Sequence, residues 1–255
     1  MRNFWAVFKR ELKVYFTSPI AYAVMIIFLA MAGYFFYTGM SYYSMLSFQA
    51  AQNPQIYKVN LSEVVMNPLF GNVSVVMLLM IPALTMRLFA EEKKTGTYEL
   101  LFTYPLRDVE VLLGKYFAAM TVFTVMVGLT GGYLVILLFF GKSIPDVTLS
   151  GYLGLFLMGA AFMALGILVS AMTENQIVAS VVSFGLLLIL WLLGWTSSMV
   201  GPGLAKVLEY LSLIKHFQNF SRGLLDTADL AYYLCFIFFF LFLTLRMLES
   251  KRWRG

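Results

Sequence analysis

The stretch from Phe70 to Leu88 reads FGNVSVVMLLMIPALTMRL, and its only charged residue stands next to its end. A helix that crosses a bilayer needs about 20 mostly apolar residues, because the hydrocarbon core is about 30 Å thick. The stretch therefore predicts a membrane-spanning helix. Five further stretches have the same character, and none of the six carries a charged residue or a histidine in its central turns: about Ile20–Tyr37, Tyr116–Phe140, Leu149–Met172, Ile177–Met199 and Ala228–Leu248.

The composition of the whole chain supports this interpretation. Of its 255 residues, 61% are hydrophobic and 12% are charged, with a mean hydropathy of +0.82. Soluble domains typically have about half apolar and about a quarter charged residues. These totals exclude an ordinary cytosolic enzyme and a disordered protein, and the single cysteine, Cys235, excludes a disulfide scaffold. We predict an all-α membrane protein with six transmembrane helices, organised as one domain over residues 1–255.

Six spans place both termini on one side of the membrane, and the lysines and arginines predict which side. The side of the termini carries 13 of the 18 bases. By the positive-inside rule, both termini are cytoplasmic in a multi-pass protein of the cell (inner) membrane, and the net charge of +5 reflects orientation, not nucleic-acid binding. A cleaved signal peptide is the alternative, because Ala30-Met31-Ala32 resembles a cleavage site. The apolar run continues through Phe36, which favours an uncleaved span.

Residues 1–18 predict an interfacial helix that ends at Ser18-Pro19. Aromatic and apolar residues recur at helical spacing, and bases fall on the other side. A basic anchor in the headgroup plane and a lever against a cytoplasmic partner both remain open, and the composition favours the anchor. The aromatic face contains Phe4, Trp5, Phe8, Leu12, Tyr15 and Phe16, and the basic face contains Arg2, Lys9, Arg10 and Lys13.

The segment 89–107 between the second and third spans carries charges of both signs, which a simple basic anchor does not require. Gly96 breaks the chain, and Thr97 is a suitable N-cap for a short helix. Glu99 falls in the first turn of that helix, where the helix dipole favours an acid, and Pro105 ends it. Two interpretations remain open: a solvated charged loop, and a docking surface on which opposite charges fix the register of a protein partner.

Two outer segments and one stripe of small residues complete the organisation. The tyrosine-rich segment 38–69 is expected to be a loop, either a connector or a lid. The segment 200–227 contains the amphipathic stretch Leu204–Leu211 and predicts at least one short helix at the outer leaflet. Small residues allow helix backbones to approach closely in lipid, and they mark either packing within the subunit or a homodimer seam. On the fourth span they are Gly159, Gly166 and Ser170.

Several absences limit the chemistry expected of this chain. Gly141-Lys142-Ser143 resembles the end of a phosphate-binding loop, but isoleucine stands at position 136 where the pattern needs glycine. We therefore expect no nucleotide site, no catalytic residue and no metal site, so the chain is not expected to be an enzyme. His216, the single histidine, is interpreted as a packing or hydrogen-bonding residue. The uncharged spans argue against an ion-coupled carrier and suit a scaffold or a permease driven by another subunit.

Three groups of residues together resemble one protein family. In their order within six spans they are similar to the ABC-2 type permeases, the membrane subunits of ATP-binding-cassette exporters. The chain most resembles the branch of the gliding-motility permease and the permease for nitrous-oxide-reductase maturation, although Tyr98 stands where the family often has an aliphatic residue. The groups are Pro82-x4-Arg87-x3-Glu91-Glu92-Lys93-x2-Gly96-Thr97-x-Glu99-Leu100-Leu101-x3-Pro105 with Gly114-Lys115; Lys215-His216-Phe217-x2-Phe220-x2-Gly223-x2-Asp226-x2-Asp229; and Lys9-Arg10-Glu11-Leu12 with Ser18-Pro19.

The resemblance implies an ABC-2 (type V exporter-like) fold and a set of partners. The chain, with a second copy or a homologous permease, would form the pathway, and cytoplasmic ABC ATPase subunits would hold ATP and magnesium while this chain binds no cofactor. Membrane lipid and a periplasmic or extracellular auxiliary protein are further expected partners. The implied ATPase-coupling contacts are Glu91, Glu92, Gly96, Thr97, Tyr98, Glu99, Leu100 and Pro105; the interfacial helix contributes Trp5, Phe8, Lys9 and Arg10, and the outer segment His216, Phe217, Gly223 and Asp226.

Two other classes of function remain open at this stage. One is a membrane scaffold that anchors a cytoplasmic ATPase or motility machinery without passing a substrate. The other is an intramembrane enzyme, which needs a polar catalytic group at membrane depth, and the uncharged spans argue against it. The sequence names no substrate, since copper, lipid, peptide and polysaccharide-linked cargo all remain compatible with these spans.

Overall fold

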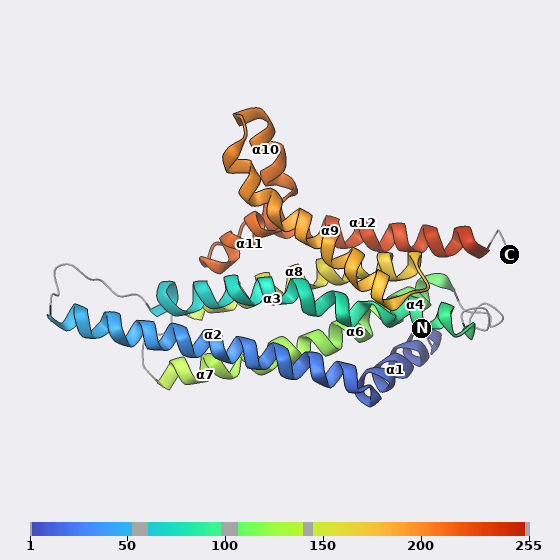
Figure 1. Cartoon of the computed structure of the whole chain (residues 1–255), viewed down its shortest axis with the longest axis horizontal. Helices are drawn as coiled ribbons and strands as arrows, with labels where there is room; N and C mark the ends of the chain where they lie inside the picture. The colour runs from blue at the N-terminus through green and yellow to red at the C-terminus, as the bar shows by residue number, and fades with distance from the viewer. Residues whose placement is uncertain (1, 53–60, 98–106, 140–144, 253–255) are drawn as a thin grey trace.

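The structure is a computed structural model that describes residues 2–52, 61–97, 107–139 and 145–252. Within these ranges the chain is helical without a strand, and the long helices lie side by side in one bundle (Figure 1). The start of α1, the end of α12 and α4 lie at the same end of the bundle, which we call the terminal end (Figure 1). The elements are α1 (Arg2–Thr17), α2 (Pro19–Gln52), the π-helix η1 (Ser62–Met66), α3 (Asn67–Thr85), α4 (Arg87–Lys94), α6 (Asp108–Thr130), α7 (Gly132–Phe139), α8 (Pro145–Met172), α9 (Gln176–Thr196), the 3-10 helix η2 (Ser197–Met199), α10 (Pro202–Leu211), α11 (Leu213–Ser221) and α12 (Thr227–Arg252).

The predicted number of membrane spans is confirmed. Among the described residues, six helical segments are long and apolar enough to cross a membrane, and each contains most of a predicted stretch. The protein is therefore a multi-pass membrane protein. The six segments are Pro19–Gln52, Glu63–Lys94, Asp108–Leu137, Val147–Met172, Gln176–Thr196 and Thr227–Ser250.

The first span is longer than the sequence indicated. α2 continues to Gln52, so the prediction of a loop was wrong for residues 38–52, and η1 and α3 begin within the same predicted loop. The reason is local, because no glycine or proline interrupts the chain between Gly39 and Pro54. At 1.5 Å per residue, a helix of 34 residues is about 50 Å long and extends beyond a hydrocarbon core of about 30 Å.

α8 is the central helix of the bundle. In its apolar window 83% of the residues are buried, against 22% in α9 and 17% in α12. It packs against α3, α6, α9, α11 and α12. A Cβ atom at Gly159 would lie 2.2 Å from the Phe123 ring, and one at Gly166 would lie 2.2 Å from Oγ1 of Thr85. The chain's own helices thus cover these glycines, which favours packing within the subunit over a dimer seam.

α1 lies against α6, and its inner face differs from the predicted aromatic face. Val7, Glu11 and Tyr15 recur every four residues and are 6%, 6% and 2% exposed. Trp5 and Phe16 are exposed. The placement of Tyr15 on the headgroup face was therefore wrong, because the helix turns this residue, together with an acid, toward the bundle.

Candidate functional site

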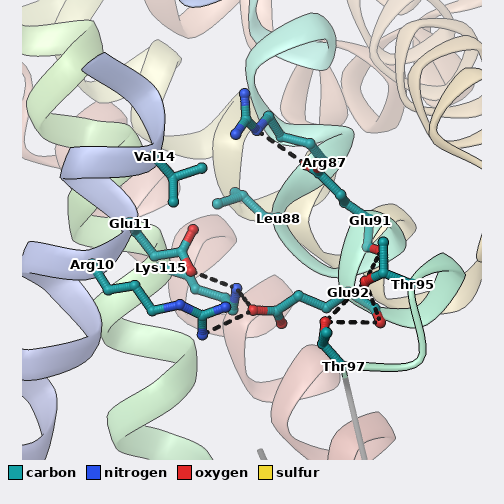
Figure 2. A pocket seen from close by; sticks show the side chains of 10 residues that line it. All are labelled: Arg10, Glu11, Val14, Arg87, Leu88, Glu91, Glu92, Thr95, Thr97 and Lys115. Atoms are coloured by element: carbon teal, nitrogen blue, oxygen red, sulfur yellow. Dashed lines mark hydrogen bonds and ion pairs between the residues drawn. The ribbon is translucent and has the colours of Figure 1, made fainter. Parts of the chain in front are cut away.

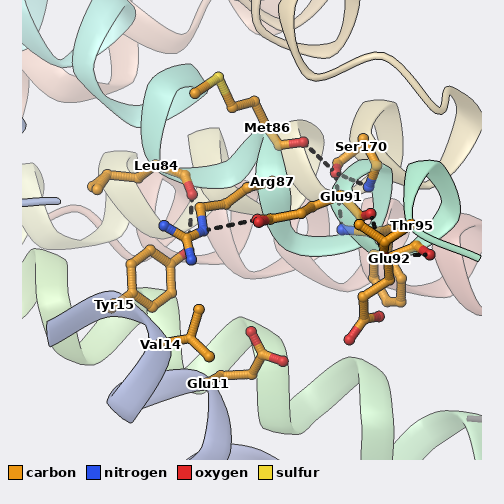
Figure 3. Close-up of polar contacts among 12 residues, drawn as sticks. Glu11, Val14, Tyr15, Leu84, Met86, Arg87, Glu91, Glu92, Thr95 and Ser170 are labelled. Atoms are coloured by element: carbon orange, nitrogen blue, oxygen red, sulfur yellow. Dashed lines mark hydrogen bonds and ion pairs between the residues drawn. The ribbon is translucent and has the colours of Figure 1, made fainter. Parts of the chain in front are cut away.

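The second span breaks at Met86, and a serine from α8 bridges the break (Figure 3). N–H groups in the first turn of a helix have no acceptor within that helix. The Ser170 hydroxyl accepts hydrogen bonds from the N–H groups of Phe89 and Ala90, at 3.1 and 3.2 Å, in the first turn of α4. It also donates to the Met86 carbonyl at 2.9 Å. Ser170 therefore fixes the start of α4 to α8.

Charged groups at the terminal end converge on Lys115 of α6 (Figure 2). Its Nζ lies 2.9 Å from Oε1 of Glu11 on α1 and 3.0 Å from Oε1 of Glu92 on α4. Nη1 of Arg10 lies 3.3 Å from the same oxygen of Glu92. Lys115 is 1% exposed, and both acids are also buried. Because a buried charge is tolerated when it is paired, this cluster joins three helices that are distant in sequence.

A second set of contacts joins α1 to the boundary between α3 and α4 (Figure 3). The Tyr15 hydroxyl donates to the Leu84 carbonyl at 2.8 Å. The Arg87 guanidinium lies 5.5 Å from the centroid of the Tyr15 ring, and its Nε lies 3.3 Å from Oε2 of Glu91. Burial raises the pKa of Tyr15 above its ordinary value, and the nearby charge of Glu11 adds to this effect. Tyr15 therefore keeps its proton and its hydrogen bond at neutral pH.

The C-terminal end of α4 is closed by Thr95 and Gly96. The N–H and the hydroxyl of Thr95 donate to the Glu91 carbonyl at 3.0 and 2.9 Å. Gly96 has a φ of +69°, a left-handed conformation that glycine adopts without the steric cost of a Cβ atom and that commonly ends helices. Nζ of Lys93 donates to the Ala171 carbonyl near the end of α8. α4 is thus held by α8 at both of its ends.

The residues at this junction enclose a pocket of about 180 Å³ between α1, α4 and α6 (Figure 2). Glu92 and Lys115 form its inner wall, while Thr95 and Thr97 lie where the described part of the loop ends. The pocket is lined by equal numbers of acids and bases. The acids are Glu11, Glu91 and Glu92, and the bases are Arg10, Arg87 and Lys115.

Four of the predicted coupling residues can be placed at this junction. Glu91 and Glu92 lie on α4, and Gly96 follows it. Oγ1 of Thr97 lies 2.9 Å from the Thr95 hydroxyl. The short helix that Thr97 was expected to cap stays a prediction, because it falls on residues that the structure does not describe: Tyr98, Glu99, Leu100 and Pro105.

The chain matches a known protein family over most of its length. The model of one family, described as ABC-2 family transporter protein, matches residues 5–249. The chain belongs to this family. It is therefore the membrane permease component of an ABC transporter and not a catalytic subunit. A search of curated proteins found no match.

In this ABC-2 family protein, the predicted outer segment contains a buried histidine–aspartate contact. Nδ1 of His216 lies 2.6 Å from Oδ1 of Asp229, and Nε2 lies 3.1 Å from the Tyr210 carbonyl. Asn219 donates to the other oxygen of Asp229 at 2.7 Å. The His216 ring also stacks on Tyr232, with centroids 3.9 Å apart. His216 thus makes packing and hydrogen-bonding contacts, as the sequence indicated.

The other outer residues have structural roles around the same segment, which forms the short helices α10 and α11. Phe217 is buried and lies 3.2 Å from the position of a Cβ atom at Gly154. Gly223 has a φ of +84° directly after α11. Oδ1 of Asp226 accepts a hydrogen bond from the N–H of Ala228 at 2.9 Å, at the start of α12.

The predicted residues of the interfacial helix have two different kinds of surroundings in the structure. Arg10 reaches the charged cluster through Glu92. Trp5 and Lys9 are exposed, and Phe8 packs edge-to-face against Trp5 with ring centroids 5.4 Å apart. The contact between Arg10 and Glu92 is polar and joins two helices of the bundle. Trp5, Phe8 and Lys9 lie on a surface that lipid headgroups can cover.

Sequence reasoning did not connect Glu11 with Lys115, although both residues occur in the quoted motifs. The available signal was the position of Glu11, four residues from both Val7 and Tyr15, on what proved to be the inner face of α1. A lysine directly before an apolar span was the complementary signal. Among the described residues, no group of three or more His, Cys, Asp or Glu residues is arranged to hold a metal ion.

Proposed function

We propose that this permease belongs to an exporter in which separate cytoplasmic ATPase subunits bind and hydrolyse ATP with magnesium. The segment that follows α4 is the coupling helix that docks on those subunits. In this proposal both termini and the terminal end of the bundle are cytoplasmic, in the inner membrane. The permease itself holds no cofactor.

The observation that carries this proposal is the double attachment of α4. On one side Glu92 contacts Lys115 of α6 and Arg10 of α1. On the other side Ser170 and Lys93 bind α4 to α8. A displacement of the segment that follows α4 is therefore transmitted to three helices, including the central one. A solvated loop that only connects two spans does not require these attachments.

The substitution Glu99→Lys tests the coupling helix. We expect the variant to insert and fold normally but to lose transport and the stimulation of ATP hydrolysis by the permease, because a reversed charge opposes docking. Both activities are measured with the complex reconstituted in liposomes. Glu249→Lys is the matched control, since Glu249 is near the terminal end and, among the described residues, pairs with Arg246 of its own helix at 2.9 Å. Normal stimulation and transport in Glu99→Lys would overturn the coupling assignment.

We further propose that a second copy of the chain, or a homologous permease, completes the translocation pathway. The low burial of α9 and α12, 22% and 17% of their apolar windows, supports this because it leaves wide apolar surfaces. Cross-linking in native membranes followed by mass measurement tests this proposal. A complex that transports its cargo with a single permease chain would contradict it.

A membrane scaffold is the second candidate function. It is favoured by the spans themselves, whose central turns carry no charged residue to line a polar path. The reconstituted complex separates the two candidates, since a scaffold supports ATP hydrolysis without moving any cargo. The resemblance to the gliding-motility and nitrous-oxide-reductase-maturation branch, and an auxiliary protein outside the membrane, belong to the proposal and rest on the sequence motifs.

A further inference from the structure

The carboxylate of Glu92 has one oxygen that the described part of its own chain does not satisfy. Oε1 lies within ion-pair distance of Lys115 and Arg10, although neither contact has hydrogen-bond geometry. Oε2 is buried and has no hydrogen-bond partner among the described residues. Glu92 is only 7% exposed, so the protein shields this oxygen from most of the solvent. A buried charged acceptor without a donor is costly, and it marks a place where a donor is expected.

The carboxylate lines the pocket between α1, α4 and α6 (Figure 2). The neighbouring cations are already engaged: Arg87 with Glu91, and Lys93 with the Ala171 carbonyl. Residues 98–106, which follow the pocket in sequence, contain no lysine or arginine. Arg87 and Lys93 would have to leave their present acceptors to reach Oε2, so the donor is expected to come from another molecule.

We propose that this pocket receives one arginine side chain of the ATP-binding partner. This inference rests on the proposed function and specifies how the partner is recognised. A guanidinium group offers several N–H donors in a planar fork that matches a carboxylate, and it forms stronger hydrogen bonds with a charged acceptor than with a neutral one. The exposed carboxylate of Glu91 at the rim adds negative potential on the way in.

Arg10 is the residue that yields when the arginine enters. Its side chain is 52% exposed, whereas that of Lys115 is 1% exposed, so Arg10 can turn toward water at little cost. The incoming guanidinium then takes its place beside Glu92. The partner's arginine thus replaces Arg10 as the cation beside Glu92. The net charge around the carboxylate therefore stays the same.

Opposite effects of two substitutions test this exchange. The ATP-binding subunit is first identified by its co-purification with the wild-type permease. The dissociation constant of the purified subunit is then measured by titration into permease in lipid nanodiscs. We expect Glu92→Gln to raise it about tenfold, equivalent to about 1.4 kcal/mol. We expect Arg10→Gln to lower it or leave it unchanged, because Arg10 competes for the same carboxylate. Glu209→Gln, a matched change in α10, is the control, and we expect it to leave the dissociation constant unchanged.

Other variants keep the test decisive if Glu92→Gln is poorly folded, which thermal unfolding of the free permease reveals. Thr95→Arg places a guanidinium from the chain itself at the exposed rim, so we expect it to compete and to weaken binding without removing a contact of the Glu92 carboxylate. In a charge swap, Glu92→Arg in the permease is combined with subunit variants in which one arginine at a time is replaced by glutamate. We expect one of these combinations to recover binding.

The possible failures are distinguishable. If the wild-type permease binds no ATP-binding subunit, the proposed function itself is wrong. If the wild type binds but Glu92→Gln binds within twofold as well, the arginine pocket is wrong while the coupling proposal stands. If Arg10→Gln weakens binding as much as Glu92→Gln, the cluster acts only through the stability of the junction, and the exchange is likewise overturned.

Discussion

The ammonium group of Lys115 lies 2.9 Å from the carboxylate of Glu11, although 104 positions separate the two residues. Both are buried, so the contact fixes α1 to α6 inside the protein and not at its surface. A helix that only anchors the chain in the headgroup layer does not need a buried ion pair. The contact therefore shows that α1 is attached to the bundle through α6, while a lever against a cytoplasmic partner stays a prediction.

We expect Lys115→Met to lower the free energy of unfolding by about 3–5 kcal/mol, because it removes the ion-pair partner of the buried Glu11 and leaves the buried Glu92 with Arg10 alone. Chemical unfolding of the purified protein in detergent measures the change. Lys94→Met is the control, since Lys94 is an exposed lysine on α4, the helix that carries Glu92. A loss below about 1 kcal/mol would show that the cluster behaves like an exposed salt bridge.

Ser170→Ala is expected to loosen α4 with little effect elsewhere. It leaves the N–H groups of Phe89 and Ala90 without their acceptor, which costs about 1–3 kcal/mol. Hydrogen exchange of residues 87–94 should become faster, because the first turn of α4 opens more often. Thr121→Ala is the comparison, since that hydroxyl donates to the Phe117 carbonyl within its own helix. Unchanged exchange in residues 87–94 would contradict the bridging role.

Gly159→Ala should destabilise the bundle by about 1–3 kcal/mol, as overpacking of a closely packed core does. The new Cβ atom would lie 2.2 Å from the Phe123 ring, which is fully buried and cannot move freely. Gly185→Ala is the matched change, because a Cβ atom there would meet no atom within 4 Å beyond the nearby backbone of its own helix, among the described residues. Thermal unfolding of both variants should separate them, and equal unfolding temperatures would show that α6 and α8 are not tightly packed at this point.

Asp229→Ala should release the outer segment from α12. His216 and Asn219 lose their shared acceptor, and one buried unsatisfied group costs about 1–3 kcal/mol. We expect faster hydrogen exchange in residues 213–221 and no change in residues 87–94. Glu249→Ala, which breaks an exposed pair at the far end of α12, should leave both segments unchanged. Protection of residues 213–221 at the wild-type level would mean that apolar packing around Phe217 alone holds the segment.

Much of the architecture was predictable from local sequence patterns. The six apolar runs identified the spans because hydropathy depends on each run by itself. The break at Gly96 and the end of α1 at Ser18-Pro19 were predictable for the same reason, since glycine and proline act on their own backbone. The extension of α2 was missed because polar serines and tyrosines suggested a loop, whereas the absence of a helix breaker decided the outcome.

The contacts of the site, in contrast, were not predictable from local sequence patterns. Glu92 and Arg10 were identified as candidates from motifs, but their contacts with Lys115 were not. Likewise Ser170 was recognised as a small residue on a helix face, while its hydrogen bonds to the first turn of α4 were not foreseen. In each case the missing information was the identity of the neighbouring helix.

The sequence by itself determined that this chain crosses the membrane six times, that the chain breaks at Ser18-Pro19 and Gly96, and which family it resembles. These properties follow from short windows of residues, whose hydropathy and backbone preferences act locally. Only the tertiary structure decided that Glu11 pairs with Lys115, that Ser170 bridges the break at Met86, and that a buried oxygen of Glu92 has no hydrogen-bond donor in the described part of the chain. Those contacts depend on which helices pack together, because a buried charge or hydroxyl bonds whatever partner the fold brings within about 3 Å.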